Sequence, residues 1–451
     1  MLQDHHIQSP RTAVPEAEDA TAVALRGHER RWLLTSDFRW MWWSQVLSQV
    51  ADGVSRLALL WFVYAVTGSA LQTSVIGLLQ TLPPILFGPF IGVWVDRLPK
   101  KAILIGSDVA RGLLIGGVPC WVSIETFTVE TLYVLVFLYG IATAMFVPTL
   151  SASVPSLVSR SRFVAANALL QSTTSIGIVV GPALSGLGIA FSGSKEVLCA
   201  NALVYLGSAV CLVPIRLPHR RTEGLRGRIV VTALRDLLEG FRFTFVSQRT
   251  ILILTLMASI YTFGTGAFTT LFPVFAKKML ALGPVEVGYL WSWLGVGLLV
   301  VSLGLVAITQ WRIHQRVRVV TISAMIGGIA LCALVWTHDL IAATVIVTII
   351  GMTFGIWTPI AWGLIQEFSP AHMMGRVMAI YATVATMTSM AGMTFFGWLT
   401  ERYNSESSVV GIGFVLFLLA LASAWFNHRV VDLPGTAEVT PYPSGVRRLT
   451  A

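Results

Sequence analysis

Long apolar runs separated by short polar connections fill almost the whole chain. Twelve of these runs approach or exceed ~20 residues, the length at which a helix rising ~1.5 Å per residue crosses a ~30 Å hydrocarbon core. The runs lie at residues 40–66, 71–95, 102–122, 131–157, 164–191, 197–215, 250–275, 286–310, 319–336, 340–366, 376–399 and 408–427. Runs this continuous exclude the ~10-residue alternating strands of a membrane β-barrel, the one other structure that lipid admits. The pattern predicts an all-α membrane protein with twelve transmembrane helices.

Composition agrees with this prediction, and charge adds an orientation. Hydrophobic residues make up 55% of the 451 residues and charged residues 12%, with a mean hydropathy of +0.75, whereas about a quarter of a soluble domain is charged. Connections after even-numbered spans are basic, as at Arg97, Lys100 and Lys101, and those after odd-numbered spans carry few cations. By the positive-inside rule, the basic connections and both termini face the cytoplasm. We therefore expect a multi-pass protein of the cytoplasmic (inner) membrane, with its cations at lipid headgroups and no nucleic-acid partner.

The longest polar connection divides the spans six and six. We expect a cytoplasmic central linker at 216–249 between an N-terminal half at 36–215 and a C-terminal half at 250–427. Residues 1–35 are predicted to be a disordered cytoplasmic tail, and residues 428–451 a second cytoplasmic tail.

The two halves also show weak internal similarity. A shift of 211 residues (264 − 53 = 211) superposes Gly53 on Gly264, Gly77 on Gly288, Gly140 on Gly351 and Pro148 on Pro359. Parallel repeats with a substrate site at their interface are a known plan of secondary transporters.

The first span carries a stripe of polar residues. Gln45, Gln49, Asp52 and Arg56 recur at steps of 4, 3 and 4, which places them on one helix face that must point to the bundle interior or to a water-filled cavity. Asp52 follows Trp42 by ten residues, about 15 Å of helix, so it lies near the membrane midplane. We predict that Asp52 is the proton-coupling site and that Arg56 is its charge partner or a contact for an anionic substrate group. A purely structural ion pair is the alternative.

The second span ends in a charged loop, Gly92-Val-Trp-Val-Asp96-Arg97-Leu-Pro-Lys100-Lys101. This loop resembles the signature G-x-x-x-D-R-x-G-R-R/K between spans two and three of the major facilitator superfamily (MFS). Residues 51–70, 82–101, 107–114 and 166–186 are together similar to its drug:proton antiporter branch, which holds macrolide efflux proteins and the enterobactin exporter. The resemblance covers residues 36–427 and implies the MFS fold of two pseudo-symmetric six-helix halves. Two departures are Pro99 in place of the usual glycine and the absence of any arginine from 131–157.

The resemblance implies a cytoplasmic gate at this loop. Asp96 would cap the N-terminus of the eleventh span, around Met374 to Arg376, where free N–H groups favour an anion. The predicted gate residues are Gly92, Asp96, Arg97, Lys100, Lys101, Asp108 and Arg111. Two plainer readings remain open: Asp96 offsets neighbouring cations, and Asp108 and Arg111 form a fixed ion pair at i, i+3.

A second motif lies in the fifth span. Gly177, Gly181, Pro182 and Gly186 resemble the family's antiporter motif, which implies export. Glycines at this spacing permit close helix approach, and undirected small-residue packing is the alternative. The predicted substrate cavity is lined by Gln45, Gln49, Trp357, Trp362 and Tyr381.

These features predict a secondary transporter rather than an enzyme. No G-x-x-x-x-G-K-[ST] loop occurs, so a proton gradient rather than ATP is expected to supply the energy, with no cofactor. The four cysteines lack close metal-ligand spacing, so no metal site is expected. We predict a monomer in contact with membrane lipids that exports amphiphilic or hydrophobic small molecules, of drug or siderophore type, by proton antiport with alternating access. The alternatives are a lysophospholipid or other lipid transporter of the same fold, and a non-transporting receptor or scaffold.

Overall fold

The computed structural model describes residues 36–122, 129–159, 162–217, 239–305, 311–370 and 373–431. Within these ranges twelve helices are long and apolar enough to span a membrane. They are α2 (Ser36–Thr67), α3 (Ala70–Arg97), α4 (Lys100–Val122), α5 (Val129–Leu157), α6 (Phe163–Ser192), α7 (Ser194–Leu212), α9 (Arg249–Leu280), α10 (Pro284–Leu305), α11 (Ile313–Val335), α12 (Leu340–Phe368), α13 (Met374–Arg402) and α14 (Ser405–Val431). The predicted number of spans is confirmed, and each observed helix overlaps one predicted span.

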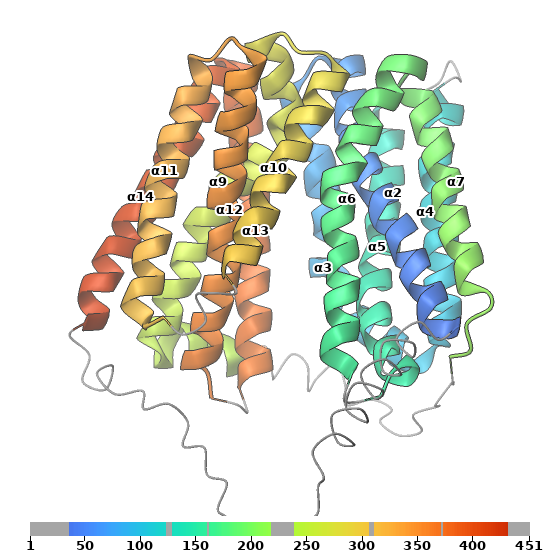
Figure 1. The fold of residues 1–451 in the computed structure, drawn as a ribbon, viewed down its shortest axis with the longest axis horizontal. Helices are drawn as coiled ribbons and strands as arrows, with labels where there is room; N and C mark the ends of the chain where they lie inside the picture. Colours follow the sequence, from blue (N-terminus) through green and yellow to red (C-terminus); the bar gives the residue numbers. More distant parts are fainter. Residues whose placement is uncertain are drawn as a thin grey trace, which may run out of the picture.

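The helices form two groups of six that stand side by side (Figure 1). In the first group, α2 packs against α6 and α7, α3 against α5, and α4 against α5 and α7. In the second group, α9 packs against α13 and α14, α10 against α12, and α11 against α12 and α14. The groups meet mainly where α3 contacts α13 and where α6 contacts α10. The interface between the halves is therefore built by two helix pairs.

The 211-residue shift seen in the sequence also relates packing contacts. A Cβ atom at Gly140 would lie 2.8 Å from Pro83 of α3, and one at Gly351 would collide with Leu294 of α10. Both members of this second contact lie 211 residues after those of the first. Because neither glycine has room for a side chain, the same close helix approach recurs in each half.

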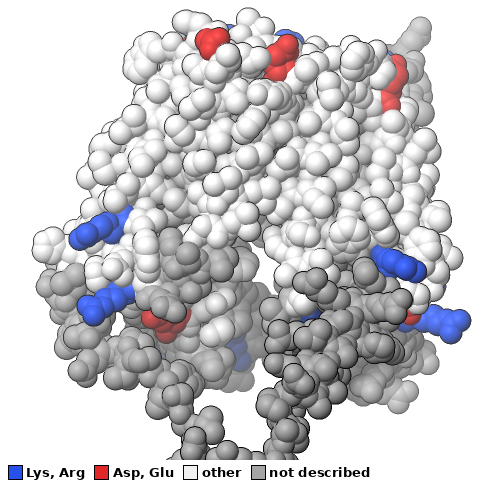
Figure 2. Space-filling model, in the orientation of Figure 1, with Lys and Arg blue, Asp and Glu red and all other residues white. Residues whose placement is uncertain are grey.

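The two ends of the bundle differ in charge. We call the end where α2 begins and α14 ends the basic end, since it carries Arg97, Lys101, Arg316 and Arg318, and the other end the acidic end. Figure 2 shows most of the visible Lys and Arg side chains toward the lower, basic end and acidic ones at the top. This asymmetry is the one that the positive-inside rule uses to orient a protein.

Contacts between the halves concentrate at the acidic end. The Ala70 N–H at the start of α3 donates to Glu401 Oε2 near the end of α13 at 2.8 Å. The ammonium of Lys277, from α9, lies 5.2 Å from the ring centroid of Trp61 and 5.3 Å from that of Tyr64, both in α2. Toward the basic end the white surfaces of the two halves draw apart (Figure 2). The bundle is therefore closed at its acidic end.

Parts of the predicted domain plan lie outside the described residues, namely 1–35, 218–238 and 432–451. The last part of the predicted linker is helical from residue 239 and includes a π-helical turn, Phe243–Ser247. Glu239 at its start forms an ion pair with Arg376 of α13 at 2.8 Å. This contact ties the end of the linker to the C-terminal half.

Candidate functional site

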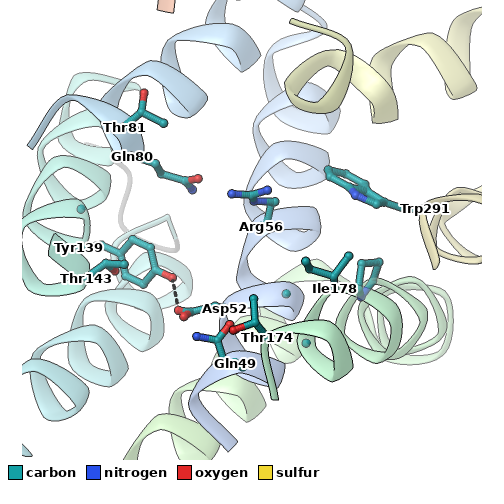
Figure 3. A pocket seen from close by; sticks show the side chains of 14 residues that line it. Gln49, Asp52, Arg56, Gln80, Thr81, Tyr139, Thr143, Thr174, Ile178 and Trp291 are labelled. Carbon is teal, nitrogen blue, oxygen red and sulfur yellow. Dashed lines mark hydrogen bonds between the residues drawn. The ribbon is translucent and has the colours of Figure 1, made fainter. Parts of the chain in front are cut away.

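A cavity of about 300 Å³ lies between the halves in the middle of the bundle (Figure 3). Its volume is at the lower limit of the ~300–1,000 Å³ typical of small-molecule sites. It is lined by Gln49, Asp52, Gly53 and Arg56 of α2, Gln80 and Thr81 of α3, Tyr139, Gly140 and Thr143 of α5, Thr174, Gly177, Ile178 and Pro182 of α6, and Trp291 of α10. Thirteen of the fourteen lining residues belong to the N-terminal half, so that half supplies nearly all of the polar chemistry.

Asp52 is the acid of this cavity, and three side chains bind it. Its Oδ1 accepts hydrogen bonds from the hydroxyl of Tyr205 at 2.6 Å and from that of Tyr139 at 3.1 Å. Arg111 Nη1 lies 3.1 Å from the same oxygen and 3.3 Å from Oδ2. The side chain nevertheless remains 26% exposed, on the cavity side. The carboxylate is thus held firmly and still reached from the cavity.

Arg111 forms ion pairs with two acidic side chains, Asp52 and Asp108. Its Nη2 donates to Asp108 Oδ1 and, at 2.9 Å, to Ser48 Oγ. The Arg111 and Asp108 side chains are completely buried. The guanidinium carbon also lies 4.3 Å from the ring centroid of Phe146, a cation–π arrangement. One guanidinium therefore serves two carboxylates in a water-excluded position.

Two polar side chains of helix α7, Ser208 and Asn201, form hydrogen bonds with the residues of this cluster and with α2. Ser208 Oγ lies 2.6 Å from Asp108 Oδ2 and 2.8 Å from Ser44 Oγ of α2. Asn201 Nδ2 donates to the Ala51 carbonyl at 3.0 Å and to Ser55 Oγ at 2.7 Å. These bonds fix the rotation of α2 against α7, which keeps Asp52 turned toward the cavity.

The predicted pair of Asp52 and Arg56 is not formed. The partner of Asp52 is Arg111, although Arg56 follows Asp52 by only one helical turn. The two side chains leave the helix in different directions, Asp52 toward Tyr139 and Arg56 toward Gln80 (Figure 3). Because two tyrosines and Arg111 already occupy the carboxylate, the nearer arginine remains in the cavity.

The gate prediction is corrected in part. Asp108 and Arg111 do pair, but they join Asp52 in mid-bundle rather than Arg97 at the helix end. Lys100 Nζ donates to the Ala152 carbonyl and Lys101 Nζ to the Val213 carbonyl, each at 2.6 Å and each within the N-terminal half.

The rest of the gate stays a prediction. Arg97 is exposed at the end of α3. Gly92 and Asp96 lie within α3, but the structure does not describe the side chain of Asp96, so the predicted cap on α13 is not tested.

The glycines of α6 allow close approach on two sides. A Cβ at Gly181 would lie 2.6 Å from Gly53 Cα, and one at Gly177 would collide with the Gln49 carbonyl, both in α2. A Cβ at Gly186 would collide with the Pro284 carbonyl of α10, in the other half. Pro182 lies between these contacts and lines the cavity. Helix α6 thus packs tightly against α2 in its own half and against α10 in the other half.

The predicted cavity residues are only partly correct. Gln49 lines the cavity, whereas Gln45 is buried behind it. Trp357 and Tyr381 are buried in the C-terminal half, and Trp362 is exposed and does not line this cavity. Sequence reasoning missed the lining residues Gln80, Thr81, Tyr139, Thr143, Thr174, Ile178 and Trp291. Polar residues inside apolar spans, such as Gln80, were the available signal.

Comparison with known proteins agrees with this architecture. The sequence profile described as Major Facilitator Superfamily matches residues 41–393. Macrolide efflux protein A of Streptococcus pyogenes is 24% identical over 405 residues, which cover 88% of this chain and 97% of that protein. Multidrug efflux pump Tap of Mycolicibacterium fortuitum is 24% identical over 395 residues, 85% of this chain and 94% of that protein.

Solved structures share the fold at lower identity. A bacterial homologue of the human lysosomal transporter Spinster, inward-facing and unoccupied, superposes with a TM-score of 0.69 at 14% identity and covers 88% of this chain and 98% of its own. A bacterial homologue of the iron transporter ferroportin, in an inward-facing state, gives a TM-score of 0.67 at 15% identity, with 86% and 98% coverage.

Proposed function

The chain belongs to the Major Facilitator Superfamily, a family of transporters, and from that premise we propose that it exports amphiphilic small molecules in exchange for protons. The observation that carries the proposal is the shared guanidinium: Arg111 binds both Asp52 and Asp108. Two carboxylates beside one arginine leave a net negative charge in a buried cluster, which is costly in low dielectric. One proton neutralises it.

Asp52 is the member of the cluster that can exchange this proton. Asp108 is fully buried, whereas Asp52 is 26% exposed toward the cavity. The phenolic oxygens of Tyr139 and Tyr205 are also 2.8 Å apart, so these two oxygens and Asp52 Oδ1 form a triangle of short contacts. When Asp52 is ionised, the two tyrosine hydroxyls supply only two protons for these three oxygen–oxygen contacts. A proton on Asp52 supplies the third, so that every contact can be a hydrogen bond.

Alternating access is supported by the unequal ends of the bundle. The acidic end is closed by contacts between the halves, including the bond from Ala70 to Glu401. By the positive-inside rule the basic end faces the cytoplasm, so the conformation corresponds to a cavity open toward the cytoplasm. Export then requires that the proton leaves toward the cytoplasm, substrate binds, the acidic end opens, and a new proton enters from outside.

The test is substrate-driven proton movement in proteoliposomes with an entrapped pH indicator. A panel of macrolides, siderophores and lysolipids is applied to the native protein and to Asp52→Asn, with Asp37→Asn at the start of the same helix as matched control. We expect at least one compound to move protons with the native protein and with Asp37→Asn but not with Asp52→Asn.

Three outcomes would contradict the proposal. Proton movement by Asp52→Asn at the native rate would remove Asp52 from the mechanism. Flipping of a fluorescent lysolipid without proton movement would identify a lipid carrier. Binding of compounds without transport of any would indicate a receptor.

A further inference from the structure

Arg56 is the charged lining residue for which the described part of the chain provides no hydrogen-bond or ion-pair partner. Its side chain is exposed and points into the space between Gln80 and Trp291 (Figure 3). Asp52, its natural partner by spacing, pairs with Arg111 and the tyrosines instead. An unpaired guanidinium at membrane depth is costly unless water or a ligand solvates it. In the proposed function a proton takes up the surplus negative charge of the Asp52 cluster, so the cavity then holds a cation that no ion pair among the described residues neutralises.

Other unused donors face the same cavity. Gln80 Nε2 and Thr143 Oγ1 have no hydrogen-bond partner among the described residues; both atoms are buried in this conformation, and rotation of their side chains would bring them to a ligand. With Arg56 they offer a guanidinium, an amide and a hydroxyl around one space. A carboxylate, sulfonate or phosphate matches this set, because a guanidinium donates two parallel hydrogen bonds to such a group. An ammonium group would meet Arg56 as a like charge.

The remaining wall of the cavity is apolar. Ile178 of α6 and the indole of Trp291 of α10 line the side opposite Gln80 and Thr81 (Figure 3). Trp291 is only 4% exposed and packs edge-on against Phe272 at 5.6 Å. Its ring is therefore held in place from behind. A ligand that fits has an acidic group toward Arg56 and an apolar body toward Trp291.

We propose that the transported molecule is an amphiphilic anion whose acidic group binds Arg56. The inference rests on the proposed export function and names the substrate class of that site. The acidic group is a carboxylate, sulfonate or phosphate, from a soluble molecule or from a lipid headgroup. Asp52 takes the proton and Arg56 takes the substrate, so the two roles fall on separate residues of one helix.

The test is equilibrium binding of probes that share a fluorophore and differ in charge. Dansylglycine is the anion, dansylamide the neutral probe and dansylcadaverine the cation, each titrated into purified protein in neutral maltoside micelles. We expect the native protein to bind dansylglycine more tightly than the other two. Arg56→Gln should lose about tenfold in affinity for the anion alone, since one charge-assisted contact is removed. Fluorescent lysophosphatidic acid in a parallel titration distinguishes a lipid headgroup from a soluble acid.

Arg318→Gln is the matched control, because Arg318 is exposed on α11 outside the cavity and the net charge changes equally. Equal or weaker binding of dansylglycine relative to dansylcadaverine by the native protein would overturn the inference, and this comparison needs no variant. So would native affinity in Arg56→Gln. Because binding is measured without a proton gradient, anion binding that depends on Arg56 would survive a failure of proton-coupled export.

Discussion

Helices α2 and α4 bring three charged side chains together inside the N-terminal half, whereas the corresponding helices α9 and α11 bring none together in the described part of the chain. A shift of 211 residues replaces Asp52, Asp108 and Arg111 by Phe263, Val319 and Ile322. Arg111 is completely buried, and Ile322 is 50% exposed. The interior of the C-terminal half is instead aromatic, as where Tyr261 stacks on Trp357 at 5.6 Å.

The packing of the two halves is nevertheless shared. Gly181 is pressed against Gly53 in one half, and Gly392, 211 residues later, is pressed against Phe263 in the other. The comparison teaches that helix packing follows the repeat while chemistry does not. One half carries the charged side chains that line the cavity, and the other supplies an apolar wall, chiefly Trp291.

The largest effect is expected from removing the shared cation. Arg111→Met leaves Asp52 and Asp108 without their common partner, and losing one member of a buried ion cluster costs about 3–5 kcal/mol. The corresponding change in the other half, Ile322→Met, should cost little because that side chain is half-exposed. Thermal unfolding of the purified proteins measures both. Equal melting temperatures would show that the cluster is not structurally important.

Placing an acid in the apolar half should have the next largest effect. Phe263→Asp puts a carboxylate beside Phe395 and Phe396, where the described residues offer no cation. We expect it to be less stable than Phe263→Asn by at most about 2.5–3.5 kcal/mol, the whole cost of a charge at mid-membrane, because the amide of Asn is also costly there. Urea- or detergent-induced unfolding compares the two. If the Asp and Asn variants are equally stable, this interior is not apolar.

At equivalent close helix contacts, the same substitution should destabilise the two halves by similar amounts. Gly181→Ala and Gly392→Ala each place a methyl group against backbone atoms, and overpacking costs about 1–3 kcal/mol. Gly106→Ala and Gly363→Ala are the controls, because a Cβ at either position meets nothing within 4 Å. Melting temperatures of the four variants test this symmetry. A penalty confined to one half would argue against the repeat.

The smallest expected effect is the difference in stability between Phe variants of two buried tyrosines, one in each half. Tyr205→Phe removes a hydrogen bond to a carboxylate, and Tyr261→Phe removes one to the Phe354 carbonyl at 2.7 Å. Because bonds to charged groups are stronger, we expect Tyr205→Phe to be less stable by about 1 kcal/mol. The difference in unfolding free energy measures it, and the reverse order would mean that the bond from Tyr205 to Asp52 is not charge-assisted, as when Asp52 holds its proton.

The fold was predictable from the sequence because lipid leaves few alternatives. Apolar runs of ~20 residues must be helices, and their charges orient them. The polar face of the first span was predictable too, since Gln49, Asp52 and Arg56 all line the cavity. Helical periodicity fixes which face a residue occupies, but it says nothing about which other helix lies opposite.

The partner of Asp52 was therefore not predictable from local spacing. Arg56 is closer along the chain, yet Arg111 of α4 reaches the carboxylate because α7 packs against both α2 and α4. Depth was a usable signal: Arg111 is about 14 Å along its predicted span and Asp52 about 18 Å along its own, so the two lie within about one helical turn of the same level. Tyr139 and Tyr205 carry no comparable signal, because a lone tyrosine in an apolar span equally suits lipid or core.

The most direct test of the central claim, that Asp52 holds the exchanged proton, is proton exchange on ligand binding. A ligand found in the binding titrations is added to purified protein in weakly buffered detergent solution containing a pH indicator. The account predicts that the native protein exchanges a proton with the solution and that a folded, ligand-binding Asp52→Asn variant exchanges none. Equal exchange by the two proteins would contradict it.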